Sequence, residues 1–225
     1  MPRHAKPRTN APPSLYDNTR ITDYKRCPRF FMYRHIFDWQ AEGRSLPLVF
    51  GGGWHKAMEV IWPAIINNPK VDVQQLTKAA YSAFYQEWLD NGLPPVDEMD
   101  LELTKEMEPR TPMIAMEMLV GYITHRLNLR QNFELIHVEK PFAVPLDPND
   151  PNLFYIGKID KIVRDKSRGK ILGVEHKSTT AYKKSDKLPF RSAFLDSFSP
   201  NSQVDGYLYA LHLIYPGQVG GVWVD

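Results

Sequence analysis

Two acidic residues and a lysine lie at the ends of two neighbouring apolar segments. Asp160 ends the segment YIGKID, and Glu175 and Lys177 lie in ILGVEHK, so that fifteen positions separate the two acids. The segment DKSRG at 165–169 has the composition of a tight turn, which predicts that the two apolar segments form a hairpin. Because residues two apart in a strand share a face, Glu175 and Lys177 are expected to point together toward Asp160.

This set of side chains suits the binding of a divalent cation. Two carboxylates held close together repel, and one of them normally keeps a proton. A cation removes that conflict, and carboxylate and carbonyl oxygens suit Mg²⁺ or Mn²⁺. Such an ion polarises a phosphodiester and activates water, while a lysine beside it orients or deprotonates the water or stabilises negative charge. The alternative is a surface salt bridge between Glu175 and Lys177, because an acid two positions before a lysine is common.

Four motifs, taken in order, resemble one family of nucleases. GKID followed by VEHK resembles the PD-(D/E)xK nuclease superfamily. Three further segments resemble motifs of the RecB-like exonuclease branch. They are GWHKAMEVIW with His55, QVDGYLYAL with Gln203 and Tyr207, and YKRCPRFFMYR with Cys27. The resemblance extends from about Ile21 onward, and over this range the chain is similar to CRISPR-associated RecB-like and AddB nucleases. It implies a metal-dependent DNA nuclease.

The resemblance implies roles for the residues of the hairpin and for one upstream histidine. Asp160, Glu175 and Lys177 would be catalytic, with Mg²⁺ or Mn²⁺ as the cofactor. His55 would be an imidazole ligand to the ion together with the two carboxylates, and the alternative is a partly buried helix histidine with no metal role. The ring of His176 is expected to face the other way and to be structural, while its backbone carbonyl binds the ion.

Other residues are candidates for contacts around that site. Gln203 and Tyr207 are four apart on one helix face, where they would hydrogen-bond the DNA backbone or hold the active-site strand. Tyr207 has a core position as its alternative. Glu139 matches an acidic position on the first strand of such enzymes, beside the ligands or at a second ion. Basic residues near the site are candidates for phosphate contacts, and we expect most of them to be solvated: Lys158, Lys161, Lys183, Lys184, Lys187 and Arg191.

Cys27 is the only cysteine in the sequence. Some RecB-like exonucleases hold an iron–sulfur cluster with four cysteines, the first of which lies in the segment that Cys27 matches. The other three are absent, so a four-cysteine cluster cannot form in this chain as given. Either the chain is a cluster-free member of the branch or its C-terminus is truncated, and we favour the cluster-free member, with Cys27 as a small buried apolar residue.

The segment 22–39 (TDYKRCPRFFMYRHIFDW) interleaves aromatic and basic residues. Two short helices that meet at Pro28 account for its pattern. We expect these helices to pack on the core. The alternative is a surface on which a nucleic-acid strand stacks.

The remaining pattern predicts class α/β. A helix is expected to start after Gly51–Gly53, since the glycines permit a turn into the site, and to stop near Pro63 or soon after. Further expected helices are 73–89, 113–129 (well buried) and 202–214, and expected strands are 135–144, 153–163, 171–176 and 219–224, with loops over 93–112 and from 177 to 200. The result is a restriction-endonuclease-like core, a mixed central sheet flanked by helices, with an N-terminal helical elaboration.

Domain organisation follows from the same pattern. Residues 1–13 are expected to be a disordered basic arm, and 14–225 a single nuclease domain. Its helical part covers about 14–132 and its sheet-bearing catalytic core about 133–225. The last strand ends abruptly at Asp225, which leaves open whether a downstream segment is missing.

Composition limits the classes of protein that need be considered. Hydrophobic residues make up 43% and charged residues 24% of the 225, as in an ordinary globular protein. The net charge of +2 is too weak on its own to imply nucleic acid. No apolar run approaches the ~20 residues that cross a bilayer, and no secretory signal is present, so we expect no membrane partner and a cytoplasmic location, bacterial or in a phage-infected host.

Three functions fit these observations. The first is an exonuclease on DNA ends, in recombination, repair or phage DNA processing, which the Q-x-x-x-Y motif favours by analogy. The second is a structure- or site-specific endonuclease. The third is a non-catalytic DNA-end-binding protein on the same fold, against which the intact Asp160, Glu175 and Lys177 argue. The sequence has no P-loop, so coupled unwinding would need a helicase or recombination protein as partner.

Overall fold

The computed structural model describes residues 13–39, 43, 45–179 and 190–225. The helices in these ranges are α1 (Asn18–Arg26), α2 (Pro28–Phe31), the π-helix η1 (Met32–Ile36), α3 (Leu46–Asn67), α4 (Val73–Asp90), the 3₁₀ helix η2 (Val96–Glu98), α5 (Leu101–Met107), α6 (Pro112–Arg126), α7 (Leu129–Asn132), α8 (Ser192–Asp196) and α9 (Ser202–Ile214). The strands are β1 (Ser14–Tyr16), β2 (Phe133–Asp147), β3 (Asp150–Asp165), β4 (Ile171–Glu175) and β5 (Val219–Val224).

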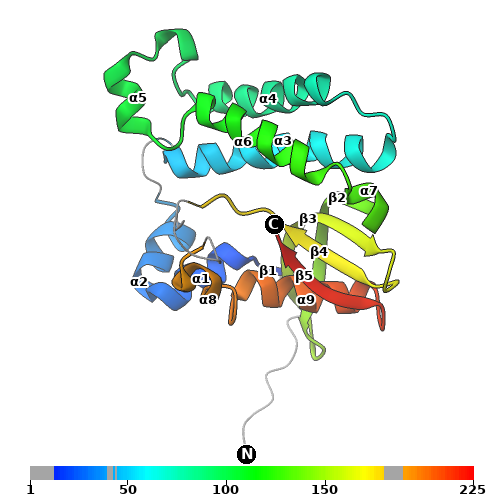
Figure 1. Cartoon of the computed structure of the whole chain (residues 1–225). Coiled ribbons are helices and arrows are strands. Elements are labelled where there is room, and N and C mark those ends of the chain that lie inside the picture. The colour runs from blue at the N-terminus through cyan, green and yellow to red at the C-terminus, as the bar shows by residue number, and fades with distance from the viewer. Residues whose placement is uncertain (1–12, 40–42, 44, 180–189) are drawn as a thin grey trace, which may run out of the picture.

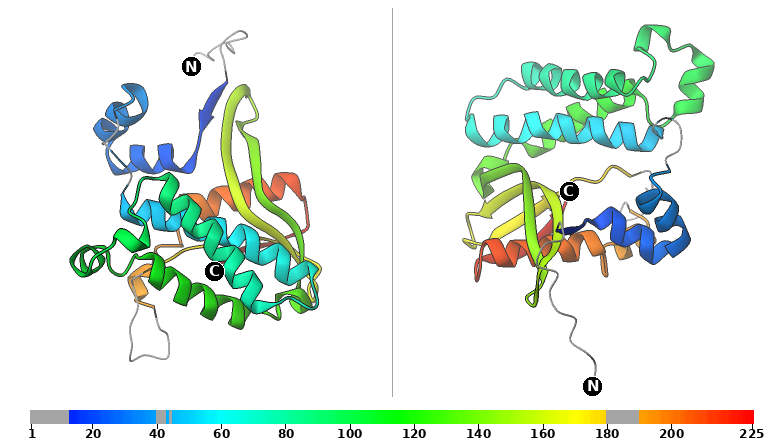
Figure 2. Two further views of the ribbon diagram at one scale, coloured as in Figure 1. Left: turned by 90° about the horizontal axis from the view of Figure 1, so that it is seen from above. Right: turned by 180° about the vertical axis from the view of Figure 1, so that it is seen from behind.

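The elements form three layers. Helices α3, α4 and α6 lie together on one face of the sheet, and α9 runs along the opposite face (Figure 1). The two further views show the same arrangement, with α1 and α2 at one side of the sheet and α1 beside the start of α9 (Figure 2). This is a mixed α/β fold with a central sheet flanked by helices, and the predicted fold class is confirmed.

The long strand β3 organises the sheet. It pairs antiparallel with β2 along one edge, and on its other edge with β1 near its start and with β4 near its end. β5 then adds parallel to β4. The β3–β4 hairpin turns through the predicted segment, where the side chain of Asp165 accepts hydrogen bonds from the backbone of Ser167 and Arg168. The hairpin that was predicted to carry the two acids is therefore confirmed.

Two apolar clusters hold the layers together. The larger one lies within the α3, α4 and α6 layer and reaches the sheet at Val163 and Val174. The smaller one lies between the sheet and α9, with Ile159, Ile162 and Leu211 among its members. The catalytic candidates thus lie in a sheet that is packed on both faces.

The start predicted for α3 is wrong, whereas its end lies soon after Pro63, as predicted. The helix begins at Leu46 and ends at Asn67, so that Gly51–Gly53 and Pro63 are all inside it. Burial of apolar residues both before the glycines and after the proline outweighs their unfavourable helix propensity. The glycines form no turn into the site. A Cβ atom at Gly53 would lie 2.7 Å from Cδ2 of Phe84, so this glycine lets α3 and α4 approach closely.

Three smaller predictions also need correction. The region 93–112, predicted as a loop, contains η2 and α5, and Asp100 caps α5 by accepting a hydrogen bond from Leu103 N. The loop predicted before Pro200 contains α8. Helix α6 is less buried than predicted, because Met113 and Val120 are exposed.

Among the described residues, no helix combines the length and apolarity needed to cross a membrane.

Candidate active site

Asp160 lies in β3 and is almost completely buried. Its Oδ2 atom lies 3.2 Å from Nδ1 of His55, which comes from the middle of α3. The same oxygen accepts a hydrogen bond from the backbone N–H of His176 at 2.9 Å. Helix α3, strand β3 and the segment after β4 therefore converge on one carboxylate oxygen.

Glu175 ends β4 and forms an ion pair with Lys177, as residues two apart on one strand face can do. Gln203, from α9, joins both side chains. Its Nε2 donates to Glu175 Oε1 at 2.9 Å, and its Oε1 accepts from Lys177 Nζ at 3.0 Å. One amide thus fixes the acid and the lysine relative to each other.

Tyr207 extends this network to the neighbouring strand. Its hydroxyl donates to the backbone carbonyl of Lys158 in β3 at 2.7 Å and accepts from Gln203 Nε2 at 3.1 Å. The tyrosine is buried. Of the two roles considered for Gln203 and Tyr207, the geometry fits the one in which they hold the strands that carry Asp160 and Glu175.

Glu139, in β2, has a φ angle of +50°, which is rare for a residue with a side chain. The register places it opposite Asp160, between the pairs Val138–Lys161 and Lys140–Ile159. Its carboxylate pairs with Lys158 and lies 3.9 Å from Lys161 Nζ. Backbone strain of this kind collects at functional sites, and here it accompanies an acid that faces the candidate centre.

His55, Glu139 and Asp160 form the group best placed to hold a metal ion. One ligand atom from each lies within 4.8 Å of the others. Two carboxylate oxygens nearby, Oε1 of Glu139 and Oε2 of Glu175, are buried without a hydrogen-bond partner among the described residues. Buried acceptors without donors are costly, and a cation would satisfy them. The donor set of imidazole and carboxylates suits Mn²⁺ or Mg²⁺.

The electrostatics of the site separate its two carboxylates. Burial raises the pKa of Asp160, but the hydrogen bonds from His55 and from the His176 backbone outweigh burial, and the pKa lies below its ordinary value. Burial and the charge of Asp160 raise the pKa of Glu175. Burial lowers the pKa of His55, but the hydrogen bond and charge of Asp160 raise it above its ordinary value. Of the two carboxyl groups, Glu175 is thus the one whose ionisation is opposed, because Asp160 already carries a negative charge beside it.

The ring of His176 points away from Glu175 and Lys177, toward α3 and α6. It is completely buried, 5.5 Å from the Trp62 ring between centroids, and its Nδ1 lies 3.3 Å from Oδ2 of Asp225. Burial lowers the pKa of this ring. Its backbone N–H is the group that contacts Asp160, which gives the residue a positioning role that sequence reasoning did not assign.

Asp225 belongs to a buried network that sequence reasoning also missed. Its side chain is hydrogen-bonded to Tyr122 and paired with Arg126, both from α6, and it lies beside His176. Its backbone N–H donates to the carbonyl of Glu175 at 2.9 Å. The network ties the helical layer to the strand that carries the acid. The only available signal was an acidic residue directly after an apolar strand.

Several expectations for individual residues change. Lys161 belongs to a group of basic residues most of which were expected to be solvated, but it is completely buried, and burial lowers its pKa. Cys27 was expected to be buried but is exposed. Lys158 is about half exposed, yet it pairs with Glu139. Candidate phosphate contacts that lie outside the described residues are Lys183, Lys184 and Lys187, and the arm 1–13 lies outside them except for Pro13.

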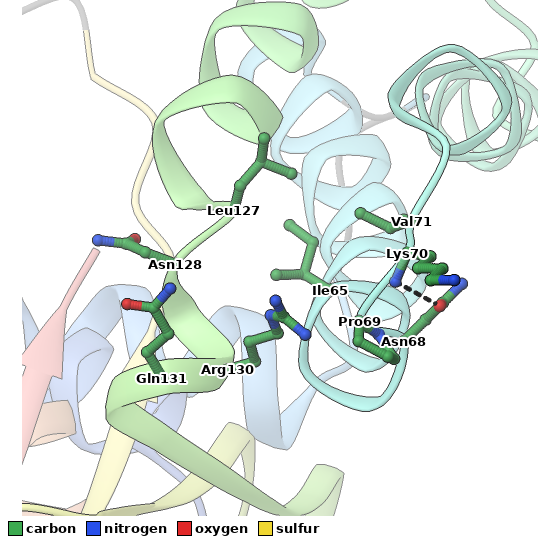
Figure 3. A pocket seen from close by; sticks show the side chains of 9 residues that line it. All are labelled: Ile65, Asn68, Pro69, Lys70, Val71, Leu127, Asn128, Arg130 and Gln131. Atoms are coloured by element: carbon green, nitrogen blue, oxygen red, sulfur yellow. Dashed lines mark hydrogen bonds between the residues drawn. The ribbon is translucent and has the colours of Figure 1, made fainter.

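A pocket elsewhere on the molecule is separate from this site. It has a volume of about 340 Å³ and lies where the end of α3 meets the connection from α6 to α7. Figure 3 shows Leu127, Arg130 and Gln131 facing Ile65 across it. The residues that line it include none of the catalytic or metal-binding candidates. The candidate active site is therefore identified from the side chains that converge on Asp160, and not from this pocket.

The chain matches the PD-(D/E)XK nuclease superfamily over residues 18–224 and belongs to it. The match covers the α3 helix, the β3–β4 hairpin and α9, which are the elements that carry the candidate site. A search of curated proteins found no match. The membership and the donor set together point to divalent-metal chemistry at the cluster around Asp160.

Replacement of His55 tests whether α3 contributes a ligand. We expect His55→Ala to weaken Mn²⁺ affinity by about tenfold or more, because one of the three clustered donors is lost. The free energy of unfolding in the absence of metal should change little, since His55 is partly exposed. Titration calorimetry with Mn²⁺ measures the affinity. His212→Ala, an exposed histidine on α9, is the matched control. Equal Mn²⁺ affinity in wild type and His55→Ala would exclude the histidine as a ligand.

Proposed function

We propose that this chain is a metal-dependent deoxyribonuclease that hydrolyses phosphodiester bonds from DNA ends, as a member of the RecB-like branch. The observation that carries the proposal is the convergence of His55 on Asp160, next to the Glu175–Lys177 pair. The shared nuclease core does not require a histidine from a helix so far upstream, whereas the RecB-like motifs do.

The residues have distinct tasks in this proposal. His55, Glu139 and Asp160 hold the ion, and Glu175 offers its unpartnered oxygen beside them. When bound, the ion polarises the phosphodiester and lowers the pKa of a coordinated water. Lys177 is held by Gln203 at the partly exposed rim, where it orients the attacking water or stabilises negative charge that develops on the phosphate.

Gln203, Tyr207 and His176 act as positioning residues. Gln203 keeps the lysine beside Glu175, and Tyr207 anchors the same helix face to the backbone of β3. The His176 N–H orients the Asp160 carboxylate. Hydrogen bonds of this kind fix charged groups before substrate binds and so reduce reorganisation in the reaction.

The wider assignments rest on the sequence motifs. We propose a role in recombination, repair or phage DNA processing in the cytoplasm, with a helicase or recombination protein as partner. We also propose that 14–225 form one nuclease domain. A structure- or site-specific endonuclease is the second candidate, and the Q-x-x-x-Y motif supports the exonuclease instead.

Incubation with end-labelled linear DNA and with circular DNA, each single- and double-stranded, tests the activity. We expect degradation of linear but not circular substrates with Mn²⁺ or Mg²⁺. We expect no degradation with EDTA, because the clustered carboxylates act in cleavage through the cation that they bind. Restoring Mn²⁺ after chelation should restore cleavage. Cleavage of circles would favour an endonuclease. Robust cleavage in EDTA would contradict the proposed mechanism.

A further inference from the structure

The N-terminal helices present a group of aromatic rings to solvent. Tyr24, Phe30, Phe37 and Trp39 are 57%, 40%, 54% and 65% exposed, respectively. Tyr33 lies among them and stacks on Trp39, with ring centroids 4.8 Å apart and an interplanar angle of 16°. We refer to these five residues as the aromatic surface. Large exposed rings gathered in one region are uncommon on a protein that acts alone, and they mark interaction sites.

Arginines lie over these rings. The Arg26 and Arg34 guanidinium groups lie 5.7 and 5.9 Å from the centroid of the Phe30 ring, and Arg29 lies 5.7 Å from that of Tyr33. Between residues 18 and 39 the chain has five lysines and arginines against two aspartates. The region therefore carries a net positive charge larger than that of the whole chain, +2.

The segment was expected to pack on the core, and the structure contradicts this for α2 and η1, whereas α1 packs on the smaller apolar cluster through Ile21. Neither α2 nor η1 contains a buried residue. The only buried residue of α1 is Asp23, whose Oδ2 lies 3.2 Å from Arg34 Nη1 and 2.7 Å from His35 Nε2. The helices are thus held to one another by polar contacts and ring contacts, and their aromatic side chains remain available to a partner.

Helix α1, which leads into the aromatic surface, is attached to the helix that positions the catalytic pair. Helix α1 contacts the start of α9, where Ser202 Oγ donates to Asn18 Oδ1 at 2.7 Å and lies 3.2 Å from Thr22 Oγ1. The next residue along α9 is Gln203, which holds Glu175 and Lys177. Figure 1 shows α1 beside the start of α9, with α2 continuing from α1. A strand bound on these helices would approach the catalytic pair from the side on which α1 contacts α9.

We infer that the aromatic surface binds unpaired bases of single-stranded DNA next to the active site. The inference rests on the proposed nuclease function and specifies its substrate as a single-stranded end. Exposed rings stack on bases of any sequence, and interleaved arginines meet the phosphates between them. A protein partner would also cover apolar rings, but the excess of arginine over acidic residues favours a polyanion.

Binding of a fluorescent oligothymidylate, followed by anisotropy in EDTA, separates this inference from catalysis. We expect Trp39→Ala and Phe30→Ala each to weaken binding by about tenfold, and Trp39→Phe to restore most of it. Leu101→Ala, an exposed apolar residue on α5, is the matched control and should bind as wild type does. Affinity for blunt duplex DNA should change little, since its bases are not available for stacking.

Three outcomes would overturn the inference. These are unchanged oligothymidylate affinity in both alanine variants, an equal loss in Leu101→Ala, and an altered oligomeric state of Trp39→Ala with DNA affinity intact. The last outcome would identify a protein interface. Cleavage by the wild type with Mn²⁺ is measured separately. If the wild type cleaves DNA while both alanine variants bind oligothymidylate normally, the role of the aromatic surface is refuted and the proposed nuclease function is not.

Discussion

Asp160→Asn is expected to reduce DNA cleavage by about 10³-fold or more while leaving the fold intact. The substitution keeps the side-chain volume and an oxygen that can accept from the His176 N–H. It removes the negative charge that faces His55 and that completes the donor cluster. A loss of this size corresponds to about 4 kcal/mol of transition-state stabilisation, which is within what a catalytic metal ion supplies.

The melting temperature gives a second measurement of the same change. A ligand that binds only the folded state raises that temperature, so Mn²⁺ should stabilise the wild type and should stabilise Asp160→Asn much less. Asp165→Asn makes the same substitution at the end of the same strand, in the turn, and should retain both activity and the metal-induced shift. Cleavage by Asp160→Asn at the wild-type rate would exclude Asp160 from the centre.

The sequence predicted well those elements whose ends are marked locally. The helix Ser202–Ile214 and the strand Val219–Val224 have the predicted limits, because the side chain of Asn201 caps the helix and Pro216–Gly217 ends it. The β3–β4 hairpin was predicted for the same reason, since Asp165 and its neighbours form a local turn. Local chemistry determines these boundaries, and no knowledge of distant contacts is needed.

The start of helix α3 was mispredicted because it depends on distant contacts. Three successive glycines are poor helix formers, and pattern alone argues for a helix that starts only after them. The helix nevertheless continues through Gly53 because Phe84 of α4 occupies the space where a side chain would be. Such a close approach between two helices is visible only once both are placed.

The candidate site was predicted in part. His55, Asp160 and the Glu175–Lys177 pair follow from motifs, and the structure brings them together. Alternation along a strand would place Asp160 and Lys161 on opposite faces, so the position of Lys161 near Glu139 was not foreseen. Both Ile159 and Ile162 pack in the cluster beside α9, three positions apart, which shows that the alternation is interrupted between them.

Glu139 illustrates the same limit. Its acidic character was noted, but its left-handed backbone was not predictable, because nothing in HVEKPF favours positive φ. The register shift in β2 between Leu135 and His137 lies a few residues away. Irregular strand geometry of this kind redirects side chains toward a site, and it arises from pairing with β3, which sequence reasoning placed only approximately.

The role of Lys177 distinguishes chemistry from metal binding within one site. We expect Lys177→Ala to reduce cleavage by about 10²- to 10⁴-fold, as loss of a group that orients or deprotonates water does. Mn²⁺ affinity should stay close to that of wild type, because the lysine pairs with Glu175 and is absent from the cluster of His55, Glu139 and Asp160. Asp160→Asn should lose both properties, so the two variants differ in a measurable way.

Single-turnover cleavage and Mn²⁺ calorimetry on the same preparation measure the two effects. Lys56→Ala removes a lysine of α3 that pairs with Glu59 on the surface, and it should leave cleavage unchanged. Gln203→Leu should cause a smaller loss than Lys177→Ala, because the lysine remains but one hydrogen bond that positions it is gone. If Lys177→Ala cleaves normally, the lysine is a surface partner of Glu175, which is the alternative that its spacing first suggested. If its melting temperature collapses, the ion pair is structural. Retained folding and metal binding with lost cleavage is the combination that only a catalytic lysine produces.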